Sequence, residues 1–122
     1  MNKALLSLAG LLVLCGSAQA GETLDAAAVK KLITGNTAHI QRGDGSSLKT
    51  YFSPDGKVIR HENGVTSEGT WQVKDDGMHC VEGIAGGGCA RIVKNADGSY
   101  ERVQPWSKAA ITWTAIVNGK DF

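Results

Sequence analysis

The most reactive side chains of the sequence stand together at Met78-His79-Cys80, three soft ligands of the kind that binds copper. These residues fall in an expected strand, where successive side chains point to opposite faces. Met78 and Cys80 would then share one face, and His79 would lie on the other. Because the three could not bind one ion together, we predict no metal site at this position.

The three histidines, His39, His61 and His79, belong to three different expected strands. Their separations match no local zinc-binding pattern such as His-x-x-x-His. We therefore predict separate histidines on the surface or at the rim of the fold. Convergence of the three side chains in the folded molecule is the alternative that the spacing leaves open.

A glycine-rich run at Gly83-Ile84-Ala85-Gly86-Gly87-Gly88 invites comparison with a phosphate-binding loop. It lacks the Lys-Ser/Thr that such a loop requires, and a strand-like segment follows it instead of a helix. We predict a flexible hairpin loop. No serine stands in a nucleophile-elbow context, and no acid lies in an apolar run that would raise its pKa. The sequence therefore predicts no catalytic residue and no cofactor.

The tryptophans are the remaining candidates for a binding site. Trp71 and Trp113 are expected in the core, where large side chains would fill the interior and leave no ligand cavity. Trp106 lies in an expected loop, Pro105-Trp106-Ser107-Lys108. It is either a lid over one end of the fold or an exposed contact for a protein partner.

Turn chemistry divides the sequence after Gly35 into eight short runs. Ser53-Pro54-Asp55-Gly56 has the residues of a tight turn, and Asn63-Gly64 favours a type I′ hairpin. The expected strands are 37–42, 47–52, 57–62, 65–74, 78–82, 89–94, 99–104 and 109–117. Such spacing favours a mainly β fold, an eight-stranded antiparallel meander closed into a lipocalin-like barrel, with a β-sandwich as the alternative.

Two of the runs show a clean alternation of apolar and polar residues, and a helix precedes all of them. Residues 65–73 place Trp71 on the inner face, and residues 111–117 place Ile111, Trp113, Ala115 and Val117 there. The helix is expected over 23–34, with Thr23 as its N-cap and Gly35 as its stop. An apolar stripe at helical spacing must dock this short helix on the sheet.

The first twenty residues have the order of a secretory signal peptide: Lys3, an uncharged apolar run, then Ala18-Gln19-Ala20. Cleavage before Gly21 would leave one β-domain, residues 21–122. A retained anchor or lipidation at Cys15 are the alternatives. Removal of Lys3 leaves 12 basic against 12 acidic residues, so neither nucleic acid nor a membrane is an expected partner. In an oxidising compartment the two remaining cysteines, Cys80 and Cys89, predict one disulfide.

Five short motifs follow one another along the chain: Leu32-Ile33-Thr34-Gly35-Asn36-Thr37, Tyr51-Phe52-Ser53-Pro54-Asp55-Gly56, Gly69-Thr70-Trp71-Gln72-Val73, Asp76-Gly77 before Cys80, and the later Cys89. In this order they resemble a family of short secreted proteobacterial β-proteins of unknown function. The resemblance covers roughly residues 24–119. The resemblance implies a periplasmic location and a small β-rich fold, and it implies no functional residue. In architecture the expected barrel is also similar to lipocalin-like inhibitors of secreted proteases.

From these features we expect a periplasmic, non-enzymatic binding or inhibitory module that engages a protein partner, with Trp106 as the contact. The alternatives are a barrel that carries a small ligand or a metal, and an enzyme of unknown class. A cavity inside the barrel would favour the ligand carrier. A filled core with an exposed Trp106 would favour the protein partner.

Overall fold

Strands make up most of the described chain, which contains one helix. The computed structural model describes residues 21–105 and 110–122, so the expected signal peptide and Trp106 lie outside the described residues. The elements are β1 (Glu22–Thr23), α2 (Ala26–Ile33), β2 (Asn36–Arg42), β3 (Ser47–Phe52), β4 (Lys57–Glu62), β5 (Val65–Val73), β6 (His79–Glu82), β7 (Gly88–Lys94), β8 (Tyr100–Val103) and β9 (Ala110–Asn118).

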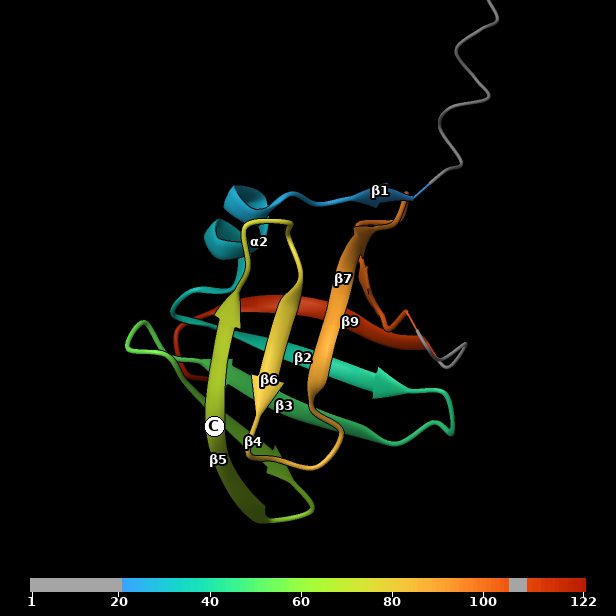
Figure 1. Ribbon diagram of the computed structural model, residues 1–122. Coiled ribbons are helices and arrows are strands. Elements are labelled where there is room, and N and C mark those ends of the chain that lie inside the picture. The colour runs from blue at the N-terminus through green and yellow to red at the C-terminus, as the bar shows by residue number, and fades with distance from the viewer. Residues whose placement is uncertain (1–20, 106–109) are drawn as a thin grey trace, which may run out of the picture.

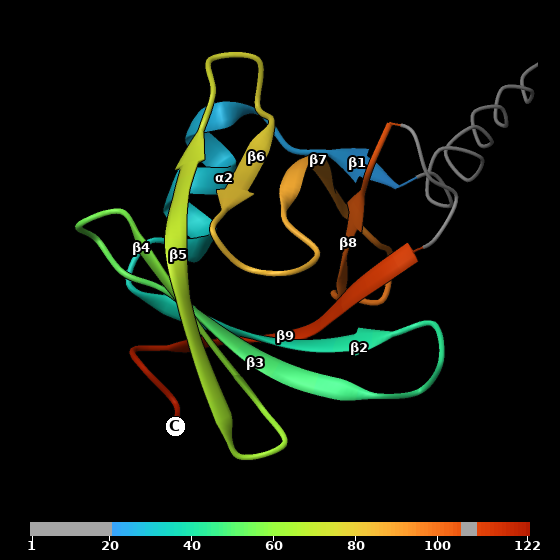
Figure 2. The same ribbon diagram turned by 60° about the horizontal axis from the view of Figure 1, so that its bottom comes forward.

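The eight longer strands form a closed antiparallel barrel. Each strand from β2 to β9 pairs with the next one in sequence, and β9 returns to pair with β2. Strands β2, β3 and β9 face β6, β7 and β8 across the barrel (Figure 2). The predicted meander barrel with one short N-terminal helix is thus confirmed, and the sandwich alternative is wrong. Closure removes the free edges that an open meander would expose.

Strand β7 is shared between two partners on one of its sides. Its first residues pair with β6, from Val81 opposite Gly88 to His79 opposite Ala90. Further along, Val93 and Lys94 pair with the two residues of β1. The start of the described chain therefore extends the barrel wall where the short strand β6 does not reach.

The predicted hairpin at Asn63-Gly64 is confirmed. Glu62 pairs with Val65, which leaves two residues in the loop, and both have positive φ, 53° at Asn63 and 77° at Gly64. This is the backbone of a type I′ turn, whose twist matches that of the flanking strands. The turn fixes the register of β4 against β5, and with it the side of β4 that faces the interior.

Helix α2 closes one end of the barrel. Its N-cap is Asp25, whose carboxylate accepts a hydrogen bond from the Ala28 amide at 2.8 Å, so the predicted cap Thr23 is wrong. Thr23 pairs with Val93 as part of β1 instead. The buried face of the helix carries Val29 and Ile33 into the core. In Figure 1 the helix lies beside the β5–β6 connection, and the β6–β7 loop lies at the opposite end.

The core occupies the helix end and the middle of the barrel. Phe52 and Trp113 are buried there with centroids 5.7 Å apart, and Trp71 packs against Phe52 edge to face at the same distance. Trp113 is fully buried, as predicted. Trp71 is half-buried, and its indole N–H donates to the Ser53 carbonyl at 2.9 Å.

The predicted inner face of β9 is correct only for its first half. The pairing of β9 with β2 shifts register at Thr114, which has no residue opposite it in the pairing. Beyond this β-bulge Ile116 stands opposite the buried Ala38 and packs against the core, whereas Ala115 is exposed. A bulge inserts one residue and so reverses the alternation that follows it. The inward assignment of Ala115 and Val117 is therefore wrong.

The predicted disulfide joins Cys80 to Cys89. The two residues lie directly opposite each other on β6 and β7, with their Cα atoms 4.0 Å apart. This bond ties the two strands together at the base of the loop that connects them. Within the described residues no helix is long and apolar enough to cross a membrane.

Candidate functional site

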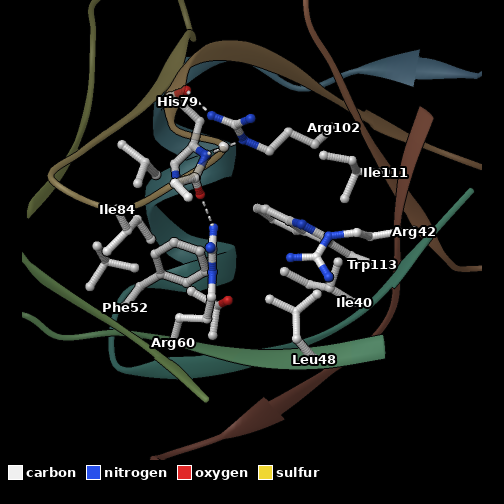
Figure 3. Close-up of a pocket in the computed structure, with 15 residues that line it drawn as sticks. Ile40, Arg42, Leu48, Phe52, Arg60, His79, Ile84, Arg102, Ile111 and Trp113 are labelled. Carbon is white, nitrogen blue, oxygen red and sulfur yellow. Dashed lines mark hydrogen bonds between the residues drawn. The ribbon is translucent and has the colours of Figure 1, made fainter. Parts of the chain in front are cut away.

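A cavity of about 180 Å³ occupies the end of the barrel opposite α2 (Figure 3). Its floor is the buried core face formed by Phe52, Val58 and Trp113. Toward the barrel end the lining residues become partly exposed, Arg42 and Ile84 among them. This gradient shows that the cavity opens to solvent at that end.

The cavity corrects the expectation of an interior filled by aromatic side chains. The aromatic residues gather near the helix, where Phe52 contacts Trp71 and Trp113. At the other end of the barrel the lining side chains leave an open space. The apolar wall around it is Ile40, Leu48, Phe52, Val58, Val81 and Ile111.

The glycine-rich segment forms the predicted hairpin loop, and it also contributes to the cavity wall. Ile84, Ala85 and Gly86 line the cavity, and the Ala85 carbonyl accepts a hydrogen bond from Arg60 Nη2 at 2.6 Å. A Cβ built on Gly69 would collide with the carbonyl oxygen of Glu82. The absence of a side chain at Gly69 therefore lets the start of this loop lie against β5.

Three arginines extend into the cavity from different strands (Figure 3). Arg42 of β2 donates from both terminal nitrogens to the Glu62 carboxylate, and one of these bonds is 3.0 Å long. Arg60 of β4 bonds the Ala85 carbonyl. Arg102 of β8 is buried, and its Nη2 donates to the Gly88 carbonyl at 2.6 Å. Desolvation and the charge of Arg60 lower the pKa of Arg102 to about 10.

His79 lies inside the barrel with 1% of its surface exposed, so its predicted place on the surface or rim is wrong. Burial, aided by the charge of Arg102, lowers the pKa of His79 to about 3. The imidazole is neutral at pH 7. Its Nδ1 lies 3.2 Å from Arg102 Nε, and because a guanidinium can only donate, Nδ1 must accept. The proton of the neutral ring is therefore on Nε2.

Three nitrogen donors of the cavity lining find no acceptor among the described residues: Arg60 Nε, His79 Nε2 and Trp113 Nε1. The two rings contact each other edge to face, with centroids 5.6 Å apart. A buried donor without an acceptor costs roughly 1–3 kcal/mol. Each of these residues lines the cavity, so an acceptor bound there is one way in which this cost would be offset.

The other two histidines lie on the outer surface of the barrel, where the end of the chain crosses it. His39 Nε2 is 2.6 Å from the Asp121 carboxylate, and the His61 ring stacks on Phe122. The three histidines do not converge. Across the described parts of the chain no group of three or more His, Cys, Asp or Glu side chains could hold a metal ion.

Sequence reasoning missed the arginines of the interior, although one signal was present. Arg60 is two residues from Val58 on β4, and inward residues of a strand recur at this spacing. The burial of Val58 therefore implies an inward Arg60. Trp106, the predicted partner contact, lies outside the described residues.

The arrangement can bind an anion. Among the described lining residues are three guanidinium groups and one neutral imidazole, and there is no carboxylate or thiol. Scans against protein-family models, curated proteins and solved structures return no match to this chain. The cavity itself must therefore carry any statement about function.

Proposed function

We propose that the protein is a non-enzymatic module that binds a small molecule inside its barrel. The observation that carries this proposal is the cavity of about 180 Å³, open at one end and lined by apolar side chains and three arginines. An apolar cavity of about 150 Å³ accommodates benzene. The space thus suits a ligand of one ring or a short chain.

A small ligand, the alternative that the sequence left open, replaces the expected protein partner in this proposal. The expectation of a protein partner depended on a filled interior and on an exposed Trp106. The interior contains a cavity, and Trp106 lies outside the described residues. A small ligand needs only the cavity.

We further propose that the module acts in the periplasm after removal of residues 1–20. The residue order of the leader supports this, since a single Lys3 precedes an apolar run and a small-residue cleavage site. The Cys80–Cys89 disulfide suits an oxidising compartment.

Native mass spectrometry of the chain purified from the periplasm tests the binding function. We expect a complex of one chain with one small molecule, which denaturation releases. Val81→Phe places a ring into the cavity wall and should abolish the complex. Ile59→Phe is the matched control, because Ile59 lies on the outer face of β4 beside the inward Val58. A bare chain in every preparation, or a complex that Val81→Phe leaves intact, would contradict the proposal.

A further inference from the structure

The cavity carries more positive charge than the described protein neutralises. Arg42 is paired with Glu62, but the hydrogen bonds of Arg60 and Arg102 go to neutral acceptors: the carbonyls of Ala85, His79 and Gly88 and the imidazole of His79. Two guanidinium groups therefore have no carboxylate partner within residues 21–105 and 110–122.

These two charges lie where charge is costly. Burial is the main cause that lowers the pKa of both Arg60 and Arg102, and the charge of Arg60 lowers that of Arg102 further. A buried cation is tolerated when an anion and hydrogen bonds compensate for the lost water. A ligand with a negative charge would relieve the repulsion and the desolvation together.

The unsatisfied donors belong to residues that line the same cavity as these charges. His79 and Trp113 are both fully or almost fully buried, and each has a ring N–H without an acceptor in the described chain. Arg60 adds its Nε, and Figure 3 shows the guanidinium groups and the indole around one common space. An acid head accepts hydrogen bonds on each of its oxygens, and a planar carboxylate matches a planar guanidinium.

The apolar residues of the cavity wall determine which group can be attached to the acid head of the ligand. Leu48, Val58 and Val81 are buried, and Ile40 and Ile111 complete an apolar surface beside the arginines. The small volume limits the apolar body to about one aromatic ring or a short chain. We propose that the ligand is a small organic acid, bound as its anion, with a carboxylate head and a compact apolar body. This inference rests on the proposed function and adds the chemical class of the ligand.

Calorimetric titration at neutral pH tests the inference with matched pairs of probes. Benzoate, phenylacetate and hexanoate are each compared with the primary amide of the same acid, which has nearly the same shape without the charge. At least one acid should bind with one-to-one stoichiometry and about tenfold or more tighter than its amide, a difference of about 1.4 kcal/mol. This ratio is measured on the unaltered chain.

A pair of arginine variants locates the effect in the cavity. Arg60→Met should weaken acid binding at least tenfold and change amide binding by less than about threefold. Arg91→Met is the control, because Arg91 is exposed on the outside of β7, and it should leave both affinities unchanged. Loss of acid binding in Arg91→Met to the same extent as in Arg60→Met would overturn the inference.

The outcomes separate this inference from the proposed function. Amides that bind as tightly as the acids would overturn the inference that the ligand is an anion. The proposed function, binding of a small molecule in the cavity, would stand. Tighter binding of phenylphosphonate than of benzoate would overturn the carboxylate head. Absence of binding by every acid and every amide would overturn both the inference and the function on which it rests.

Discussion

His79 and Arg102 form an unusual pair inside the barrel, a neutral imidazole that accepts a hydrogen bond from a cation. Nε of Arg102 bonds Nδ1 of the ring, and Nη2 lies 3.3 Å from the His79 carbonyl. The contact works only while the ring is neutral, because a protonated imidazole has no acceptor and would face a like charge. The folded state therefore favours an unprotonated His79.

The lowered pKa of His79 predicts a loss of stability in mild acid. The ring has a pKa of about 3 in the folded chain and about 6.5 in the unfolded chain, so only the unfolded chain takes up the proton between these values. Stability is fully present above pH 6.5 and falls as the pH drops, by up to about 1.4 kcal/mol per pH unit. Chemical denaturation of the wild-type chain between pH 4.5 and 6.5 measures this slope.

The variant His79→Gln isolates that slope, because an amide oxygen can replace Nδ1 as an acceptor and does not titrate. We expect a flatter dependence of the unfolding free energy on pH in the same range. Carboxylates of lowered pKa such as Glu62 contribute mainly below about pH 4.5, outside this range. A variant that keeps the full wild-type slope would show that His79 does not cause it.

Individual residues of the site were only partly predictable. The cysteine pair could be predicted because Cys80 and Cys89 are the only cysteines after residue 20. The position of His79 could not be predicted, because the sequence does not show whether a histidine in a strand lies on the inner or the outer face. Here Phe52 and Trp113 surround the ring, and these contacts come from strands far apart in sequence.

The loop between β6 and β7 is the element that couples the fold to the cavity. It is held by the disulfide at its base, by the bond from Arg60 to Ala85 and by its contact with Gly69. Because Ile84 and Ala85 line the cavity, the position of this loop determines the shape of the site.

Removal of the disulfide should destabilise the fold. The contacts of the loop with Arg60 and Gly69 should remain. The bond closes a ring of about 10 residues, and the chain-entropy relation gives roughly 2.5–3 kcal/mol for a ring of this size. Denaturant unfolding of Cys80→Ala/Cys89→Ala against the oxidised chain measures the loss. Thiol labelling of the unreduced chain should find no reactive cysteine among the two, and two reactive thiols would contradict the assignment.

Gly69→Ala tests the close approach of the loop to β5. The added methyl group would meet backbone atoms of Glu82 and Gly83, which cannot move aside as a flexible side chain would. We expect a loss of about 1–3 kcal/mol, the usual range for overpacking. Gly43→Ala is the control, since a Cβ there meets no atom within 4 Å. Equal stability of the two variants would show that the loop does not need this glycine.

At the level of elements the sequence predicts almost every strand, because turn residues mark where each one ends. Asn63-Gly64 is the clearest case, since its preferred backbone sets both the loop length and the register. The bulge at Thr114 could not be predicted, because the sequence around it alternates as an ordinary strand does. The two-residue β1 was also missed, since its pairing depends on a stretch of β7 that only the assembled barrel leaves free.

As a whole, the described part of the molecule is a barrel closed by a helix at one end and open to a cationic cavity at the other (Figures 1 and 3). Up-and-down closure follows from consecutive hairpins, and so the architecture could be derived from the sequence. The cavity could not be derived from the sequence. Whether an interior is filled depends on the summed volumes of the inward side chains of all strands. A bulge or a shift of register changes which side chains face inward, and so changes that sum.

Processing of the whole chain gives the prediction for export. The exported protein should begin at Gly21, because Ala18-Gln19-Ala20 supplies the small residues at the cleavage site. Intact mass of the protein recovered from the periplasm measures the new terminus. A chain that retains residues 1–20, or one that carries a lipid at Cys15, would contradict this prediction.

The most direct measurement of binding inside the barrel is an NMR titration that follows the indole N–H resonances. Trp113 lines the cavity and its Nε1 has no acceptor in the described chain, whereas the indole of Trp71 already bonds Ser53 and serves as an internal reference. Addition of benzoate, phenylacetate or hexanoate should move the Trp113 resonance in a saturable way and leave that of Trp71 nearly in place. A Trp113 resonance that stays fixed with all three acids, or that moves only together with Trp71, would contradict a ligand site in the cavity.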